Sequence, residues 1–428
     1  MTTECFLLGK SAPQRTDRYR MRKYRIVALL LVAAMLMGTC GCGRKKQVKL
    51  TVWGSEASQE MLREMADEFI QLHAKEAEIE IVLRVEDEDT VADNAVSNPE
   101  QLADVFSFAG DQTMRLVNAG VLMPVEQGKD QIIEANGGAD STAIVAASSG
   151  DGVLYAYPLT ASNGYFMYYN AEYFTPADVE TLDGMLRVAE QAGKSVSMDW
   201  TSGWYIYSFF GGAGMQICLA EDGNHNICDW NSTSGTYTGV DVAEAMLSVA
   251  ASDAFLNTND EGFRNGIETG EVIAGVNGPW NAEFVKKQWG DNYRAVKLPT
   301  YTLKGGQVQM ASFAGYKLVG VKASTQEPEW AVKFAEYITD EENQLKRFRV
   351  TGEGPSNVRA AQAAEVQESP AVTALRDQAP YSVRQSIASP FWTPATIFGT
   401  IMASGNPDGR DLQELLDELV EEASQPEQ

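Results

Sequence analysis

The sequence predicts an α/β fold organised as two lobes. The chain has 428 residues, more than a single hydrophobic core normally organises. Its N-terminal third alternates short β-rich runs with a stretch, Met61–Leu72, in which apolar residues recur every three or four positions, as on one face of a helix. Strands that alternate with helices indicate crossover connections and a mainly parallel sheet. The expected strands are Lys49–Trp53, Ile79–Leu83 and Asp104–Phe108.

Residues that follow these strands are the first candidates for a ligand site. In open α/β sheets, ligands bind beyond the carboxyl ends of the strands. Two such ends are Trp53–Glu56 and Phe108–Gln112. For Trp53 and Phe108, packing in the core is an equal alternative, because aromatic side chains at strand ends are often buried.

The composition is that of a folded protein with a strongly acidic surface. Hydrophobic residues make up 44% of the chain, and the formal net charge is −25. Residues 1–42 are basic, so the rest of the chain is more acidic still. This charge disfavours nucleic acid and anionic lipid surfaces as partners, because both are negatively charged.

The N-terminus has the form of an export signal. Basic residues precede the uncharged apolar run Ile26–Met37, which is too short to span a bilayer and fits the core of a signal peptide. Cys42 stands among small residues and is the expected lipidated first residue of the mature chain. Cys40 is a weaker choice because the larger Thr39 precedes it. A plain secretory signal is the alternative, and Met21 is a candidate for the true start.

Cys218 and Cys228 lie in the expected mature chain. They are equally far from Gly223 in "QICLAEDGNHNICDW", and "EDGN" between them is a turn signal. In an oxidising compartment this arrangement favours a cross-strand disulfide that closes a hairpin. Free thiols are the first alternative. A metal site that includes His225 is a weaker one, because the spacing matches no standard zinc motif.

Aromatic residues gather beside glycine and proline. The segment Leu154–Phe174 holds eight aromatics together with the breakers Pro158 and Asn163, and it is expected to form a strand, an irregular crossover and a second strand. Aromatics at the ends of elements are poorly placed for a closed core and well placed to line a cleft. The other such residues are Trp200 and Trp204 before "GGAG", Trp280 in "NGPW" and Trp392 in "SPFW".

No catalytic constellation competes with a binding cleft. Only two histidines occur, which disfavours a His-based triad or a multi-His metal centre, and the sequence has no P-loop, HExxH or GxSxG motif. No cofactor is expected. The paired carboxylates of a glycoside hydrolase remain open because acidic residues are abundant, although the run Glu86–Asp89 is more simply a solvated loop.

Several segments, taken in order, resemble one protein family. They are "LYAYPLTASNGYFMYYNAEYF", "EVIAGVNGPWNAEF" followed by "AVKLPT", and "FAGYKLVGVKASTQEPEWAVKFAEYITDEENQ". These resemble the extracellular solute-binding proteins of ABC importers, in the sugar-binding branch that includes maltodextrin-binding proteins. The resemblance runs from about Lys49 to the C-terminus. It implies a periplasmic-binding-protein-like fold, with two α/β lobes, hinge strands between them and a ligand cleft.

The resemblance also implies the division of the chain. The signal peptide, which the N-terminal residues predict independently of the resemblance, would cover residues 1–42. Lobe 1 would take 43–158 and 304–357, and lobe 2 would take 159–303 and 358–428. The expected crossings are "YPLTAS" and "KLPTYT".

Two strand ends acquire ligand-binding roles by the same resemblance. The family's strand and loop at "DVFSFAGDQ" supplies an aromatic, an acid and a base, which gives Phe108, Asp111 and Gln112; here the base is replaced by a neutral amide. Ser55 and Glu56 stand where maltodextrin binders carry an acid and a lysine, a second departure.

Tryptophans complete the implied ligand set. Trp280 and Trp392 match the family's sugar-stacking tryptophans. The match around Trp200 and Trp204 needs a gap, so which of the two faces the ligand stays open. Trp53 and Asn163 complete the candidate set.

The expected function is capture of an oligosaccharide by a lipid-anchored monomer at the extracellular face of the cytoplasmic membrane, and its delivery to ABC permease subunits. A sugar ring packs its C–H face on an aromatic plane, while its hydroxyls need hydrogen-bond donors and acceptors. Three alternatives remain: a binding protein for a non-sugar solute, a ligand sensor for a membrane kinase and an exported glycoside hydrolase.

Overall fold

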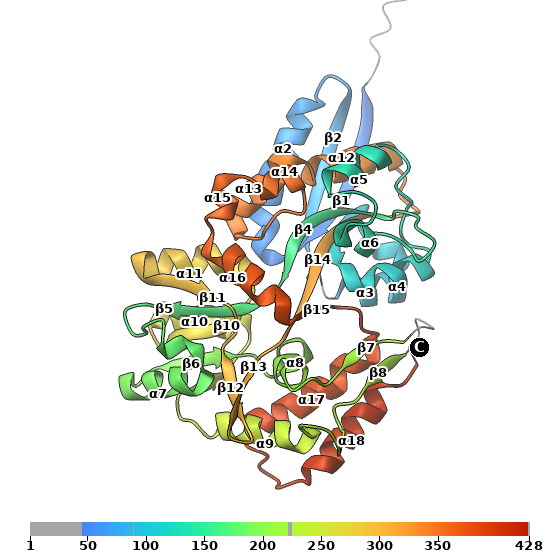
Figure 1. The fold of residues 1–428 in the computed structure, drawn as a ribbon. Helices are drawn as coiled ribbons and strands as arrows, with labels where there is room; N and C mark the ends of the chain where they lie inside the picture. Colours follow the sequence, from blue (N-terminus) through green and yellow to red (C-terminus); the bar gives the residue numbers. More distant parts are fainter. Residues whose placement is uncertain (1–44, 89, 221–224, 427–428) are drawn as a thin grey trace, which may run out of the picture. The chain divides into compact units, whose positions relative to one another are not determined.

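Two mixed β-sheets with surrounding helices form the framework of the computed structural model (Figure 1). The structure describes residues 45–88, 90–220 and 225–426. The expected signal peptide and Cys42 lie outside these residues. Within the described residues, close contacts group 45–47 with Lys75–Glu78. The described residues of Val48–Ala74 and of the chain from Ile79 onward form a second unit that carries nearly all of both sheets. Within the described ranges, no helix has the length and apolar character needed to cross a membrane.

The first sheet has six strands in the order β15-β14-β3-β1-β2, with β4 paired to β14 beside this path. Strands β1, β2 and β3 confirm the three strands expected from the sequence, and helix α2 (Gln59–Leu72) confirms the helical pattern. The strands are β1 (Lys46–Gly54), β2 (Ala77–Val85), β3 (Val105–Ala109), β4 (Ala156–Gly164), β14 (Ser312–Val321) and β15 (Ser382–Arg384).

Strand direction in the first sheet differs from the expectation. β1 and β3 are parallel, but β14 is antiparallel to both β3 and β4. The sheet is therefore mixed rather than mainly parallel, although β14 and β15 are also parallel. The expectation came from the N-terminal strands, whereas the antiparallel pairs are made by β14, which enters the sheet from a much later part of the chain. A hairpin of β12 (Thr300–Leu303) and β13 (Gly306–Gln309) precedes β14.

The second sheet has five strands in the order β11-β5-β10-β6-β9 and is also mixed. β10 is antiparallel to β5 and parallel to β6. Only Tyr165 separates β4 of the first sheet from β5 of the second, which confirms the expected strand, crossover and strand. The strands are β5 (Phe166–Asn170), β6 (Ser195–Met198), β9 (Phe255–Asn257), β10 (Val272–Asn277) and β11 (Tyr293–Val296).

Helix α8 (Gly203–Gly212) anchors the core beside the second sheet. Its sequence, GWYIYSFFGG, is apolar on almost every side, as expected of a buried helix, and most of its residues are buried. Phe210 of α8 stacks on Trp230 with ring centroids 4.1 Å apart. Because α8 is packed on almost every side, its first turn, which carries Trp204, is held in a fixed position.

The remaining α-helices are α3 (Val91–Ser97), α4 (Thr113–Asn118), α5 (Lys129–Ala135), α6 (Thr142–Ala146), α7 (Leu182–Ala192), α9 (Gly239–Ala250), α10 (Asp260–Thr269), α11 (Ala282–Trp289), α12 (Pro328–Ile338), α13 (Glu341–Thr351), α14 (Val358–Ala361), α15 (Ala364–Gln367), α16 (Pro370–Gln378), α17 (Trp392–Ala403) and α18 (Leu412–Ala423).

Candidate ligand-binding site

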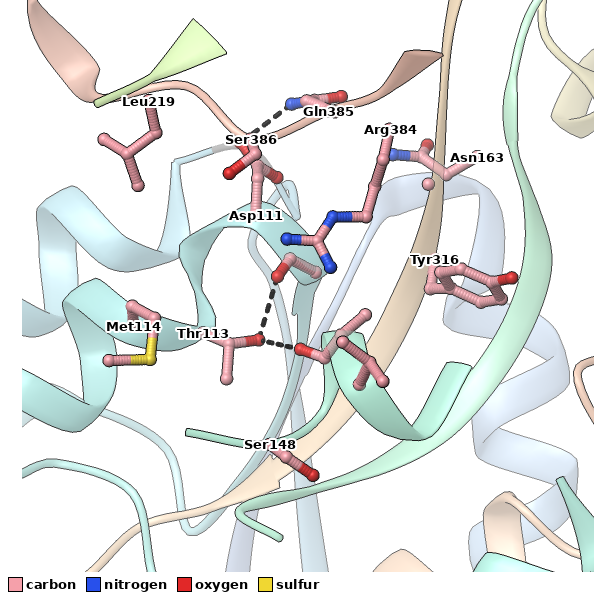
Figure 2. A pocket seen from close by; sticks show the side chains of 14 residues that line it. Asp111, Thr113, Met114, Ser148, Asn163, Leu219, Tyr316, Arg384, Gln385 and Ser386 are labelled. Atoms are coloured by element: carbon pink, nitrogen blue, oxygen red, sulfur yellow. Dashed lines mark hydrogen bonds between the residues drawn. The ribbon is translucent and has the colours of Figure 1, made fainter. Parts of the chain in front are cut away.

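A small pocket with a cavity volume of about 80 Å³, open to solvent, lies beside the ends of β3 and β15 (Figure 2). Two residues predicted from the sequence, Asp111 and Asn163, line it. Gly110 also lies in the predicted range Phe108–Gln112, and the remaining lining residues were not predicted: Thr113, Met114, Val145, Ala146, Ser148, Leu219, Gly315, Tyr316, Arg384, Gln385 and Ser386.

Asp111 lies in a short turn, η3 (Gly110–Gln112), directly after β3. Thr113 fixes this turn by donating to the carbonyls of Gly110 at 2.9 Å and Ala146 at 2.7 Å. The Asp111 carboxylate accepts a 2.8 Å hydrogen bond from Gln385 Nε2. The neighbouring Gln112 accepts from the backbone N–H of Ala92 at 3.3 Å, so its side-chain oxygen also supports helix α3.

Gln385 connects Asp111 to a tryptophan. Its Oε1 accepts a 2.8 Å hydrogen bond from Trp204 Nε1, while its Nε2 donates to Asp111. Tyr165 holds Trp204 from the other side, through a 2.8 Å hydrogen bond to the Trp204 carbonyl and a ring contact at 4.5 Å. Trp204 is half-buried. The sequence did not decide whether Trp200 or Trp204 faces the ligand. Trp204 is the one that contacts a residue of the pocket lining, Gln385.

Trp280 lies just after Gly278 and Pro279, which interrupt regular secondary structure. Strand β10 ends at Asn277, and the turn η5 (Pro279–Asn281) leads into α11. Trp280 Nε1 donates to Asp260 Oδ1 at 3.0 Å, and its ring centroid lies 5.8 Å from that of Trp204 at an interplanar angle of 33°. A Cβ at Gly278 would come within 2.0 Å of the indole. The indole therefore folds back over Gly278, and this close approach is why a glycine is needed there.

A buried ion cluster borders Trp280. Lys317 Nζ lies 2.7 Å from Glu353 and 3.5 Å from Glu88, and Arg347 lies 3.6 Å from Glu353. The same Nζ is 5.3 Å from the centroid of the Trp280 ring. Glu88 is only 9% exposed, so the interpretation of Glu86–Asp89 as a solvated loop is wrong at this position: a buried lysine recruits the carboxylate.

Both charges at the centre of this cluster are stabilised. Burial alone would raise the pKa of Glu353, but the positive charges of Lys317 and Arg347 outweigh it and hold that pKa below its usual value. Burial alone would lower the pKa of Lys317, but Glu353 and Glu88 raise it well above its usual range.

Three predicted aromatics belong to the core. Phe108 has no exposed surface and packs with Phe106 at 5.7 Å, so the expectation that it offers a face to ligand is wrong. Trp200 is also fully buried, between Phe209 and Phe255. Trp53 is 8% exposed. The reason at Phe108 is that every residue of β3 is buried, so the strand has no open face.

Ser55, Glu56 and Trp392 remain predicted ligand residues. Ser55 is half-buried and its hydroxyl pairs with that of Ser58 at 2.7 Å, while Glu56 is exposed. Trp392 is half-buried and begins α17. The starts of α17 and α8 lie close together, since a Cβ at Gly203 would come within 2.7 Å of Ala395. No contact in the structure tests a ligand role for these three residues.

The hairpin predicted around the cysteines is present, but the disulfide is not. β7 (Ile217–Leu219) and β8 (Asn226–Cys228) are antiparallel, with Cys218 opposite Ile227 and Cys228 opposite Ile217. Residues directly opposite share a face and successive residues alternate, so the two thiols lie on opposite faces of the ribbon. Both cysteines are free, and the prediction of a disulfide is corrected. The turn signal at 221–224 lies outside the described residues.

The described residues contain no group of three or more His, Cys, Asp or Glu side chains placed to hold a metal ion. Burial also raises the pKa of the Cys228 thiol to about 12, which disfavours the thiolate that a metal would need.

No sequence pattern predicted that the other residues of the site would lie there. Gln385, Arg384 and Asp260 lie in unremarkable polar contexts, and the contacts that matter come from residues far away in the chain. Lys317 is different. It is a lone charge in the apolar run "GYKLVGV" of a strand, and a charge at such a position signals a buried partner.

These features belong to an extracellular binding protein. The chain is a member of the bacterial extracellular solute-binding protein family, whose profile matches residues 64–374. The resemblance inferred from the sequence is confirmed, and the chain is a binding protein rather than an enzyme.

Two relatives come from Bacillus subtilis (strain 168). The galactooligosaccharide-binding protein is 25% identical over 419 residues, which cover 92% of this chain and 95% of the relative. The maltodextrin-binding protein MdxE is 27% identical over 239 residues, which cover 53% of this chain and 56% of the relative.

Solved structures share the fold. A solved structure with acarbose has a TM-score of 0.75 at 25% identity, and the match covers 88% of this chain and 98% of the chain in that structure. The Thermus thermophilus maltotriose binding protein, bound with maltotriose, has a TM-score of 0.70 at 20% identity, with 87% and 98% covered. The predicted two-lobed periplasmic-binding-protein-like fold is confirmed.

Proposed function

We propose that this protein captures an oligosaccharide beside Trp204 and Trp280 and delivers it to the permease subunits of an ABC importer. The observation that carries the proposal is the pair of half-buried indoles, 5.8 Å apart and bordered by hydrogen-bonding side chains of Gln385, Asp111 and Asp260. The family membership and the ligands for which the two Bacillus relatives are named, galactooligosaccharide and maltodextrin, support it.

The chemistry of a sugar suits these groups. A pyranose presents a C–H face that packs on an aromatic plane and a rim of hydroxyls that each donate and accept. Asp111, Asn163, Tyr316 and Gln385 offer both kinds of partner, and the apolar Met114 and Val145 lie among them. A cleft with apolar platforms and a few fixed polar groups selects a ligand of this kind.

Calorimetric titration tests the proposal. We expect saturable binding to at least one member of a panel of maltodextrins and galactooligosaccharides, with no hydrolysis of the ligand during the titration. Binding to no saccharide, together with tight binding to an amine or a peptide, would overturn the assignment to sugars.

Membrane attachment and the limits of the lobes are part of the same proposal. Cys42 would carry the lipid and hold a monomer at the extracellular face of the cytoplasmic membrane. Lobe 1 would comprise residues 43–158 and 304–357, and lobe 2 would comprise residues 159–303 and 358–428. Replacing Cys42→Ala should release the protein from the membrane fraction. Retention of this variant in that fraction would contradict the lipid anchor.

A further inference from the structure

We propose that Lys317 is a positioning residue that fixes the orientation of the Trp280 indole before ligand arrives. The Lys317 ammonium lies over the ring of Trp280, 5.3 Å from its centroid. A cation over an aromatic face is attracted by the negative charge of the π system, and the attraction strengthens when both groups are withdrawn from water. The consequence for affinity rests on the proposed role of Trp280 in ligand binding; the orientation itself does not.

The lysine is held where it can act on the ring. It is 9% exposed, and its Nζ lies between Glu353 at 2.7 Å and Glu88 at 3.5 Å. The nearby Arg347 brings the cluster to two positive and two negative charges. A buried lysine with compensating carboxylates keeps its charge, so the cation over the ring is permanent.

Other contacts constrain the indole at its edge and beside Trp204, and Lys317 adds a contact over its face. Asp260 holds the Nε1 edge of the indole at 3.0 Å, and the ring closes over the bare backbone of Gly278. An edge contact alone allows the ring to tilt about that edge. A charge over the face opposes the tilt, because the attraction is strongest near the ring normal.

The contact also joins the two sheets. Lys317 belongs to β14 of the first sheet, where it pairs with Ala109, two residues before Asp111. Trp280 follows β10 of the second sheet. The contact between Lys317 and the Trp280 ring therefore runs from a strand of the first sheet to the turn after a strand of the second.

Indole NMR on the ligand-free, full-length chain tests the inference. With ¹⁵N-labelled tryptophan, the Nε1–H resonance of Trp280 is assigned by its loss in Trp280→Phe. We expect Lys317→Met to shift or broaden this resonance and to weaken oligosaccharide binding about five- to thirtyfold, which spans the range from an exposed to a desolvated cation–π contact. Lys317→Arg, which keeps a cation, should restore most of both.

Lys333 provides the matched control. Its Nζ lies 4.4 Å from the ring of Trp330 on helix α12, so Lys333→Met removes a cation–π contact of the same kind elsewhere. This variant should leave the Trp280 resonance and the affinity unchanged. If Lys317→Met does not fold, the double variant Lys317→Met, Glu353→Gln removes one charge of each sign and carries the same test.

The outcomes separate the two proposals. An unchanged Trp280 resonance in a folded variant that lacks Lys317 overturns the positioning role, whatever the affinity. A wild-type protein that binds no saccharide overturns the proposed function, while the shift of the resonance still decides the role of Lys317.

Discussion

Gln385 and Asp111 are 274 positions apart in the chain, and the Gln385 amide donates a 2.8 Å hydrogen bond to the Asp111 carboxylate. The oxygen of the same amide accepts from Trp204 at 2.8 Å. One neutral side chain thus connects a strand end of the first sheet with the first turn of α8. An amide suits this position because it donates and accepts at once.

The substitution Gln385→Leu removes the hydrogen bonds to Asp111 and Trp204 while keeping the side-chain volume nearly constant. Trp204 then loses the acceptor that holds its Nε1, and we expect the affinity for oligosaccharide to fall by about 1–2 kcal/mol. Calorimetry measures the change. Gln425→Leu, which removes only a local bond to the Glu421 carbonyl, is the control and should bind like the wild type. Wild-type affinity in folded Gln385→Leu would show that the bridge does not order the site.

Trp280→Ala should weaken oligosaccharide binding by about 2 kcal/mol or more, because an aromatic platform at the centre of an interface dominates its binding energy. The measurement is a titration at constant temperature and salt. Trp289→Ala, a half-buried tryptophan at the other end of α11, is the matched control. If both variants bind equally well, the platform lies elsewhere.

Gly278→Ala tests the same ring without touching it. The new methyl group would overlap the indole, with only 2.0 Å to the nearest ring atoms, so the indole must move. We expect a loss of affinity close to that of Trp280→Ala and a changed tryptophan fluorescence spectrum. Gly306→Ala, whose new methyl group would meet nothing closer than 3.6 Å, should change neither. An unchanged spectrum in Gly278→Ala would contradict the packing described for the indole.

Trp200 should matter for stability and not for ligand contact. It is fully buried, and its indole N–H has no hydrogen-bond partner among the described residues. Trp200→Ala should lower the free energy of unfolding by about 3–5 kcal/mol, whereas Trp200→Phe should lower it less because the unsatisfied donor disappears with the indole. Denaturant titration compares the two. A large loss of affinity in a stable Trp200→Phe protein would return this residue to the ligand site.

Glu353 should make the protein sensitive to acid. Its pKa in the folded state lies below the ordinary glutamate value of 4.5, because Lys317 and Arg347 outweigh burial. The ionised carboxylate therefore contributes stability that is fully present above pH 4.5 and is lost as the pH falls through the lowered folded pKa.

Thermal unfolding between pH 7 and pH 3 measures this contribution. Glu353→Gln should be less stable than the wild type at pH 7 by about 3 kcal/mol, because it leaves buried cations without their carboxylate, and it should lose less stability in acid. Glu365→Gln, which breaks the exposed pair with Arg349, is the control and should follow the wild-type profile closely. Parallel profiles for wild type and Glu353→Gln would contradict the assignment.

The sequence predicted features that local patterns encode. The strand, crossover and strand around Asn163 followed from breakers between aromatic runs, and the turn before Trp280 followed from Gly278 and Pro279. These signals are local, because turn residues and periodicity act over a few positions.

Burial of single aromatics could not be predicted in the same way. Phe108 and Trp200 adjoin turns in the sequence as Trp204 does, yet both are fully buried, because their surroundings come from distant elements. The ion cluster was missed for a related reason. Glu88, Lys317 and Glu353 lie far apart in a chain with 59 acidic residues, and only the folded chain brings a loop, a strand and the end of a helix together.

Tyr165 also sets how the two sheets can move. It is the single residue between β4 and β5, and one residue spans at most about 3.6 Å. It contributes one φ and one ψ angle, so along this connection the sheets can change their mutual angle but cannot draw apart. At this connection an opening is therefore a rotation, and the width that it gains grows with distance from Tyr165.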